Sequence, residues 1–561
     1  MWRLASSAAL VSALALATTA PATARPAAGG APASAADAAP ATTSEAVPAD
    51  AAPSDVTPTG AGPDVTTPDA APAGDEAGPT VTATVQGWID SRTSVGYASV
   101  ARLLPANDAP QLSNLSEANL QLRLDIGDGA RIYTDLSLVW AKAGITYGAG
   151  KEGERVRLPA HDIAAFRPGS FVSELYGLLH FGEHWNLTLG KKRVVWGPGL
   201  AWNPTDLFNP PKDPTDPTQQ RAGSWLARME GQFERWTLSL LAAAKTTRQL
   251  GGVPAGLVYY PDDMPAPAFD SAGQPIDDGR DDEPHFAAGA RLYGLVADTD
   301  VQLFAFYSHL YQDVFRHKPR FGAAFSRVLG DAFVVHGEAL FQRGSARMLF
   351  NAGCLKDFGA AAGCAIAGTP IASASLRDDD GLRLKALLGL RYQFGESASV
   401  SAEYFVNAEG YDQAQFNALA AALRLRRDAT RAGLPLPSGG LPGMPGAAAG
   451  ADAGTPQKFA FEPLRRHYLF LSYMHPQLAD DFTIQAVAIL GLEDLSGQLA
   501  PQLLWSARQW LTLSAGAFIT LPGRSSLGAQ PLTGQPAADG VTEYTLQPNV
   551  WRVFFAARAF F

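Results

Sequence analysis

The feature that most limits the fold is a period-two alternation of apolar and polar residues, which runs from residue 80 to the end of the chain. Between Ala398 and Val406 every second residue is apolar, and the residues between them are mostly polar. The same alternation covers Leu120–Asp125 and Leu382–Arg391. A period of two places alternate side chains on opposite faces of an extended strand. The sequence therefore predicts strands with one apolar and one polar face.

The spacing of these segments favours a membrane-spanning barrel over a soluble sandwich, in which strands would alternate too. Segments of roughly ten residues, the length a tilted transmembrane strand needs, are joined in turn by very short links and long polar stretches. Eighteen segments begin near residues 81, 115, 131, 171, 185, 223, 235, 286, 301, 320, 332, 382, 398, 464, 482, 497, 509 and 547. We therefore expect an all-β fold, a transmembrane antiparallel β-barrel of about 18 strands, with sixteen as the alternative count. Short links would face the periplasm and long loops the exterior.

Composition excludes several other classes. Charged residues make up 17% of the chain, and 55 Gly and 41 Pro argue against coiled coils and helical arrays. A formal charge of -10 gives no reason to expect nucleic acid as a partner. No apolar run long enough for a transmembrane helix follows the N-terminus. Motifs typical of hydrolases and metalloproteases are missing, so neither an enzyme nor a metal or cofactor site is expected.

The first 79 residues have the composition of an export signal followed by a tether. Arg3 precedes an apolar stretch from Leu4 to Ala17, and Ala22–Ala24 supplies small residues for a signal peptidase. This predicts a signal peptide over residues 1–24. Residues 25–79 are rich in Ala, Pro and acidic residues, which predicts a disordered periplasmic tether or, alternatively, a partner-binding strap. The barrel itself is expected over residues 80–561.

The last segment carries the most specific local signal. Its apolar face ends on an aromatic residue and consists of Trp551, Val553, Phe555, Ala557, Ala559 and Phe561. This pattern resembles the assembly signal of bacterial outer-membrane barrels. A closed barrel also pairs every backbone amide internally, as hydrocarbon demands. We therefore expect a bacterial outer-membrane location with lipid around the barrel.

The most unusual stretch is a proline-rich loop over residues 196–221, expected to be the third external loop. Prolines remove ladder donors, so neither strand nor helix is expected here. Its aromatic residues favour folding into the lumen, with packing on the barrel rim as the alternative. The candidate constriction and carbohydrate-contact residues are Arg193, Trp196, Trp202, Asn203, Asp206, Phe208, Asp213, Asp216, Arg221 and Arg228. Anchoring of the loop is the alternative role of its aromatic rings.

Charged residues on the polar strand faces are expected to line a wet lumen. They are Arg123, Asp125, Arg383, Lys385, Arg391, Glu403, Arg552 and Arg558, and plain solvation of the interior is their alternative role. Cys354 and Cys364 lie in one long external loop, where an oxidising exterior favours a disulfide. Acidic residues over 262–283 lack the spacing of a calcium loop, so a solvated acidic loop is favoured over calcium binding.

Residues 80–561 resemble the bacterial outer-membrane porin class. The run Arg193–Gly199, followed by Asn203 and Pro204, also resembles eighteen-stranded barrels of capsule assembly and polysaccharide secretion, although the Trp-Trp and Asn-Asn doublets of that group are not both present. This resemblance implies a gated porin that exports a surface polysaccharide with a periplasmic export protein. The alternative is a general or anion-leaning diffusion porin for small solutes. An outer-membrane enzyme or adhesin is the third hypothesis.

Overall fold

The computed structural model describes most of the chain from residue 80 onward. The described residues are 80–98, 112–143, 172–209, 214–215, 223–244, 286–309, 318–345, 349–367, 369, 372–373, 381–395, 397–431, 463–523, 541–546 and 549–561. The expected signal peptide and tether over residues 1–79 lie outside them, as does the acidic segment 262–283.

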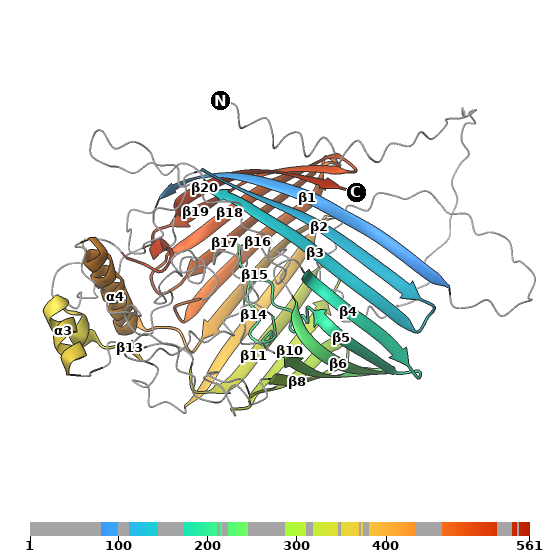
Figure 1. Ribbon diagram of the computed structural model, residues 1–561, viewed down its shortest axis with the longest axis horizontal. Helices are drawn as coiled ribbons and strands as arrows, with labels where there is room; N and C mark the ends of the chain where they lie inside the picture. Colours follow the sequence, from blue (N-terminus) through green and yellow to red (C-terminus); the bar gives the residue numbers. More distant parts are fainter. Residues whose placement is uncertain are drawn as a thin grey trace, which may run out of the picture. The chain divides into compact units, whose positions relative to one another are not determined.

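Eighteen antiparallel strands form one closed sheet (Figure 1). In chain order they are β1 (Val81–Ala98), β2 (Leu112–Ile126), β3 (Ala130–Ala143), β4 (Val172–Phe181), β5 (Trp185–Lys192), β6 (Ser224–Phe233), β7 (Trp236–Ala244), β8 (Phe286–Val296), β9 (Thr299–Ser308), β10 (Arg320–Leu329), β11 (Phe333–Arg343), β14 (Leu382–Phe394), β15 (Ala398–Asn407), β16 (His467–Leu478), β17 (Phe482–Gly491), β18 (Gly497–Arg508), β19 (Leu511–Leu521) and β20 (Asn549–Phe560). Each strand pairs with the next, and β1 pairs with β20, so the ladder closes into a ring. Closure pairs the strand amides that an open sheet would leave at its edges.

The expected all-β barrel of eighteen strands is confirmed, and the predicted strand starts fall within three residues of those observed. The apolar set of each strand points outward. On β2, for example, Leu120 and Leu122 are exposed, whereas Asn119, which precedes Leu120, is buried on the inner face. Large exposed apolar side chains recur on the outer face around the ring, from Val85 on β1 to Phe555 on β20.

The connections divide the barrel into two ends. The end with the short turns, such as 127–129 and 182–184, is called the turn end, and the opposite end the loop end. One connection differs from expectation: residues 492–496, between β17 and β18, form a short turn at the loop end. Asp494 closes this turn because its Oδ1 accepts hydrogen bonds from Ser496 N at 2.9 Å and Ser496 Oγ at 2.6 Å.

The loop end also carries helices, which the strand pattern did not predict. They are η2 (Ala352–Leu355), α3 (Phe358–Ile366), α4 (Gln413–Arg431) and η4 (Tyr544–Leu546), and a two-stranded sheet of β12 (Leu349–Phe350) and β13 (Ala372–Ser373) accompanies them. Figure 1 shows α3 and α4 beyond one end of the strands. No helix among the described residues is both long and apolar enough to cross a membrane.

Local chemistry explains where these helices begin and what holds them. Asp412 caps α4, since its Oδ1 accepts a hydrogen bond from Gln415 N at 2.9 Å. The expected disulfide between Cys354 and Cys364 is present and joins η2 to α3. Apolar side chains of α4, including Phe416 and Leu419, pack with Cys354 in one buried cluster. The loop end therefore has a small apolar core of its own.

Candidate functional site: the strap and the inner wall

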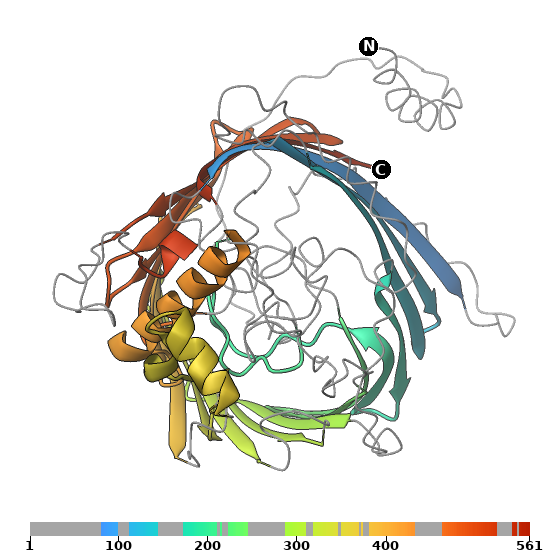
Figure 2. The same cartoon turned by 60° about the vertical axis from the view of Figure 1, so that its left-hand side comes forward.

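The described part of the third long loop, residues 193–209, leaves β5 and runs inside the ring of strands. This segment is called the strap below. Figure 2 looks obliquely into the ring and shows it in cyan-green within the ring. It contains neither strand nor helix, as its prolines predict. Of the candidate residues in the predicted loop 196–221, Asp213, Asp216 and Arg221 lie outside the described residues.

The first anchor of the strap is Trp196. Its ring lies 5.4 Å from that of Phe208 in the strap and 5.6 and 5.5 Å from Phe304 and Phe306 on β9. Gly289 on β8 leaves room for these rings, because a Cβ there would lie 2.7 Å from Phe208 and 3.0 Å from Trp196. The inner wall of β8 and β9 is therefore shaped to receive the strap.

The second anchor is Trp202, which lies six residues further along the chain and contacts a different part of the wall. It stacks on Phe405 of β15 with ring centroids 5.0 Å apart, and lies 5.5 Å from the ring of Tyr468 on β16. Aromatic pairs at such distances add stabilisation beyond the area they bury. The two indoles thus attach the strap to strands from β8 to β16.

Two carboxylates of the inner wall bind the strap backbone between these anchors. Glu338 on β11 accepts hydrogen bonds from Gly199 N at 2.7 Å and Thr205 Oγ1 at 2.9 Å. Glu403 on β15 accepts from Leu200 N at 2.6 Å and Ala201 N at 2.8 Å. Hydrogen bonds from backbone N–H groups to a carboxylate are stronger than those between neutral groups. They also satisfy N–H donors of the strap that have no partner in a β-sheet.

The close fit at Glu338 depends on the glycines of the strap. Gly197 has a φ of 89°, a conformation that disfavours other residues. A Cβ at Gly197 would also lie 2.4 Å from Glu338 Oε1. Asn203 completes this contact, because its Nδ2 donates to Gly197 O at 3.2 Å and to Glu338 Oε1 at 3.3 Å. The Gly-Pro-Gly sequence is thus required by a close approach of backbone to carboxylate.

The burial of the strap aromatics corrects one expectation. Trp196, Trp202 and Phe208 are only 1, 7 and 3% exposed. Their rings therefore offer no free face on which a sugar could stack, and they act as anchors, which was the alternative role. Asp206 is likewise engaged within the strap, where its Oδ1 accepts from Asn209 Nδ2 at 2.7 Å.

The two candidate arginines beside the strap are held by wall carboxylates. Arg193 Nη2 lies 3.0 Å from Glu174 Oε2 on β4, and its backbone N donates to Glu174 Oε1 at 2.7 Å. Arg228 on β6 is buried, and its Nη2 lies 3.2 Å from Glu230 Oε2. Arg291 on β8 joins the same carboxylate at 3.4 Å. These pairs fix the wall on either side of the point where the strap enters.

The expected lumen-lining residues lie on the inward face of their strands, with one correction. Glu403 does not line the lumen, because the strap covers it and takes up both of its oxygens. The others keep an inward position and are engaged as follows: Arg123 with Asp125 at 2.7 Å, Arg383 with Ala408 O at 3.4 Å, Lys385 with Glu409, Arg552 over the Phe518 ring at 4.5 Å, and Arg558 with Asp90 at 2.7 Å. Arg391, on the same inward face of β14, is exposed.

The inner wall consequently has two sectors. The sector where the strap packs comprises β6–β11 and β14–β17. It is called the apolar sector after its buried inward side chains Leu241, Phe304, Leu340, Phe405 and Phe470, although buried charged groups such as Arg228, Glu338 and Glu403 lie among them. The polar sector comprises β1–β4, β19 and β20. Its inward side chains include Asp90, Asn119, Asp135, Thr520 and Arg558. The sequence pattern did not separate these sectors.

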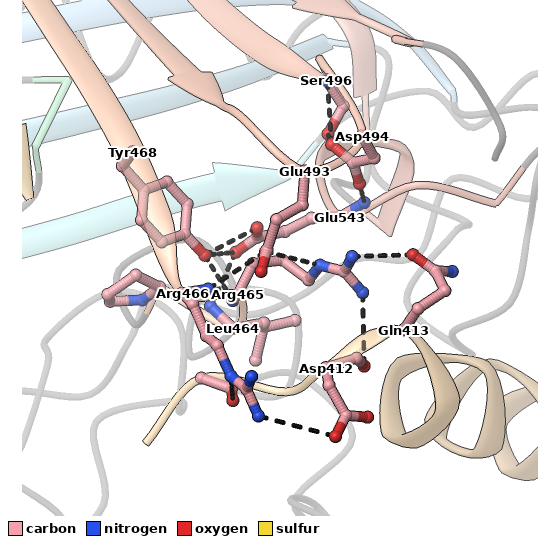
Figure 3. A network of polar contacts seen from close by, with 12 residues as sticks. Asp412, Gln413, Leu464, Arg465, Arg466, Tyr468, Glu493, Asp494, Ser496 and Glu543 are labelled. Carbon is pink, nitrogen blue, oxygen red and sulfur yellow. Dashed lines mark hydrogen bonds and ion pairs between the residues drawn. The ribbon is translucent and has the colours of Figure 1, made fainter. Parts of the chain in front are cut away.

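A network at the loop end ties three connections together and was not predicted (Figure 3). Arg465, only 2% exposed, donates to Glu493 Oε2 at 3.0 Å and to Gln413 Oε1 of α4 at 2.7 Å. Glu543 accepts from Leu464 N and from Tyr468 Oη, both at 2.7 Å. The network holds the start of α4, the 492–496 turn and residue 543 against the end of β16.

Glu543 is the titratable hub of this network. Burial raises the pKa of Glu543 to about 7, against the opposing effect of the hydrogen bonds from Leu464 N and Tyr468. Asp494 lies beside it, since Asp494 Oδ2 accepts from Glu543 N at 2.9 Å, and this second carboxylate raises the pKa further. Arg465 acts in the opposite direction. The loop end is therefore expected to respond to pH near neutrality.

Comparison with solved structures returns bacterial porins and Occ channels. The chain is 10% identical to OccAB1 of Acinetobacter baumannii, with a TM-score of 0.40, covering 86% of this chain and 96% of that one. It is 8% identical to OccK11 (OpdR) of Pseudomonas aeruginosa, with a TM-score of 0.38 and the same coverage. A triple mutant of the Rhodopseudomonas blastica porin matches at 8% identity and a TM-score of 0.32, covering 86% of this chain and 100% of that chain.

These likenesses agree with the expected resemblance to porins, whereas a resemblance to capsule-secretion barrels is not shown. No protein-family model and no curated protein sequence matches the chain. Because identities and TM-scores this low carry no conclusion about activity, the function must follow from the residues of this barrel.

Proposed function

We propose that this protein is an outer-membrane channel for small polar solutes, narrowed permanently by its strap. The observation that carries the proposal is the division of the inner wall. The strap covers apolar side chains on one side, from Phe304 on β9 to Phe470 on β16, and the opposite side keeps charged and amide groups. A barrel of this strand number encloses a water-filled lumen unless something fills it. Solutes would pass between the strap and the polar sector.

The attachments of the strap favour a fixed constriction over a gate. Displacing it would expose two indoles and the apolar wall beneath them, and truncating one buried Trp typically costs about 3–5 kcal/mol. It would also leave the Glu338 and Glu403 carboxylates without their backbone donors. A conducting channel of this kind needs no partner to open it. The export hypothesis, in which a polysaccharide and a periplasmic protein move the loop, loses its main support because the aromatic rings are buried.

The outer surface supports the location. Exposed apolar side chains such as Leu122 and Leu388 recur on the outward face of the strands. A closed ladder with an apolar exterior matches what bilayer hydrocarbon requires, so lipid is the expected neighbour of this surface.

Liposome swelling tests the proposal directly. Vesicles containing the intact protein should swell in isosmotic solutions of small sugars and exclude larger ones. A variant with residues 198–219 replaced by a short Gly/Ser link should admit larger sugars, since the constriction is gone. Circular dichroism of both proteins would check that the barrel forms. Vesicles that stay impermeable with the intact protein but swell with the shortened one would indicate a plugged channel and contradict the proposal.

A further inference from the structure

We propose that the polar sector contains a binding site for the ammonium or guanidinium group of a solute, formed by Asp90, Glu117, Asn119 and Asp135. These four residues are called the acceptor cluster. The inference deepens the proposed function, on which it rests, by naming a class of solute. It assigns a role to side chains that neither the strap nor the loop-end network uses.

Strand register brings the cluster together halfway along the barrel wall. Asp90 on β1 lies directly opposite Glu117 on β2, and Gln121 on β2 lies opposite Asp135 on β3. All four face inward, since their neighbours Leu120 and Leu122 are exposed on the outer face. Two carboxylates directly opposite each other on a ladder repel. Such a pair is unfavourable unless a cation compensates it.

The hydrogen bonds inside the cluster fix its orientation. Asn119 Nδ2 donates to Asp135 Oδ1 at 2.6 Å, and Gln121 Nε2 donates to Asp135 Oδ2 at 3.2 Å. Because a carboxylate only accepts, Asn119 must turn its nitrogen toward Asp135 and its carbonyl oxygen away from it. Ser137 donates its hydroxyl to Glu117 Oε1. The protein therefore places donors on one side of the cluster and leaves oxygens on the other.

Two of these oxygens are buried without a hydrogen-bond partner. They are Asp90 Oδ1 and Asn119 Oδ1, and Asn119 is only 3% exposed. A buried acceptor without a donor is costly, and native proteins rarely leave one without a partner. The unmet groups are both acceptors, so the missing partner is a donor.

The charges around the cluster favour a cationic donor. Among the described side chains, the carboxylates of Asp90, Glu117, Asp135 and Glu174 lie near three cations, which are Arg558, Arg193 and Lys191, the last of which interacts with Glu174. Arg558 is already held by Asp90 Oδ2 at 2.7 Å and lies 4.5 Å from the Trp88 ring centroid, and Arg193 pairs with Glu174. In the described part of the chain neither Glu117 nor Asp135 forms a salt bridge, although Arg558 and Arg193 interact with them electrostatically from further away.

The geometry fits an organic cation better than a metal ion. No group of three or more His, Cys, Asp or Glu in the described part of the chain is placed to hold a metal. An ammonium carries three N–H donors and a guanidinium five, spread over a wider span than one metal ion can bridge. Solutes bearing either group would therefore bind at the wall that faces the strap.

Calorimetric titration of the detergent-purified full-length barrel tests this site without requiring transport. The probe is agmatine, which carries one guanidinium and one ammonium, and uncharged butylurea serves as the comparison. Agmatine should bind and butylurea should not. The Glu117→Gln variant keeps an acceptor for Ser137 but loses the charge, so agmatine binding should weaken by about tenfold. Asp135→Asn should weaken agmatine binding at least as much. Because Asp135 is fully buried, its substitution could impair folding, and in that case the Glu117→Gln variant alone tests the site.

Asp128→Asn is the matched control, because Asp128 is an exposed carboxylate in the turn between β2 and β3. It removes one charge from the same hairpin outside the cluster, so binding should stay unchanged. Equal affinity of the Glu117→Gln variant and the unaltered protein, or no agmatine binding at all, would overturn the site. Sugar uptake by vesicles without agmatine binding would reject the site alone. Agmatine binding without uptake would reject the channel and leave the site standing.

Discussion

The two sectors of the inner wall differ in whether another segment of the chain has to cover them. The apolar sector exposes rings such as Phe304 and Phe405 toward the lumen, where water would surround them, and the strap removes that exposure. The polar sector forms hydrogen bonds within the wall, as Asn119 and Gln121 do with Asp135, and it keeps the buried oxygens Asp90 Oδ1 and Asn119 Oδ1 without a partner. An apolar inward face therefore needs a covering segment, whereas a polar one can border water. The position of the constriction follows from this difference.

The largest effect is expected from removing both anchors of the apolar sector. In the double variant Trp196→Ala and Trp202→Ala the strap should come loose, at a cost of about 3–5 kcal/mol for each lost ring. Thermal unfolding should shift to lower temperature and single-channel conductance should rise. Trp225→Ala is the control, because Trp225 is exposed on the outer face of β6. Unchanged conductance in the double variant would mean that the strap does not limit the channel.

A smaller effect, set by pH, is expected at the loop end, where Tyr468 links the apolar sector to Glu543. The folded protein raises the pKa of Glu543 from 4.5 to about 7, so the folded state holds a proton that the unfolded state releases. The stability contributed by this group is complete below pH 4.5 and is lost as the pH rises to about 7. The total change is on the order of 3 kcal/mol, at 1.36 kcal/mol per pKa unit.

Hydrogen exchange measures this effect. After correction for intrinsic rates, the amides of Leu464 and residues 541–546 should be better protected at pH 5 than at pH 8. Glu543→Gln, which cannot ionise, should remove the difference between the two pH values. A pH dependence that persists in this variant would assign the response to another group, such as Asp494.

The smallest effect is expected in the polar sector. Gln121→Leu removes side-chain bonds to Asp135 and Gln86 at a partly exposed position, which should cost only about 0.5–1.5 kcal/mol for each bond lost. The melting temperature should change little and the channel should still open steadily. A loss of stability as large as that of the double Trp variant would erase the distinction between the sectors.

The sequence predicted the barrel well because the apolar residues of each strand show which of its faces points outward. Period-two alternation needs no knowledge of partners, so the segments near residues 286, 382 and 398 could be placed directly. The cap at Asp412 and the Ala- and Leu-rich residues after it also carried a local helix signal, which strand counting passed over.

The strap's binding partners could not be predicted in the same way. Glu338 and Glu403 lie more than a hundred residues from the amides they bind, and no local pattern connects them. One signal was present, however. Segments such as Leu303–Tyr307 and Ala486–Leu490 are apolar on both faces, and Phe405 interrupts an otherwise polar face. A strand apolar on both faces in a barrel indicates that something covers its inner side.

Planar-bilayer conductance of the intact protein, without any partner, tests the central claim most directly. If the strap stays fixed to the apolar sector and water fills the space between it and the polar sector, the channel should show steady openings of one size. These openings should persist without an added protein or polymer. Silence, or rare openings that appear only when the strap is shortened, would contradict the account and show that the strap closes the channel instead of narrowing it.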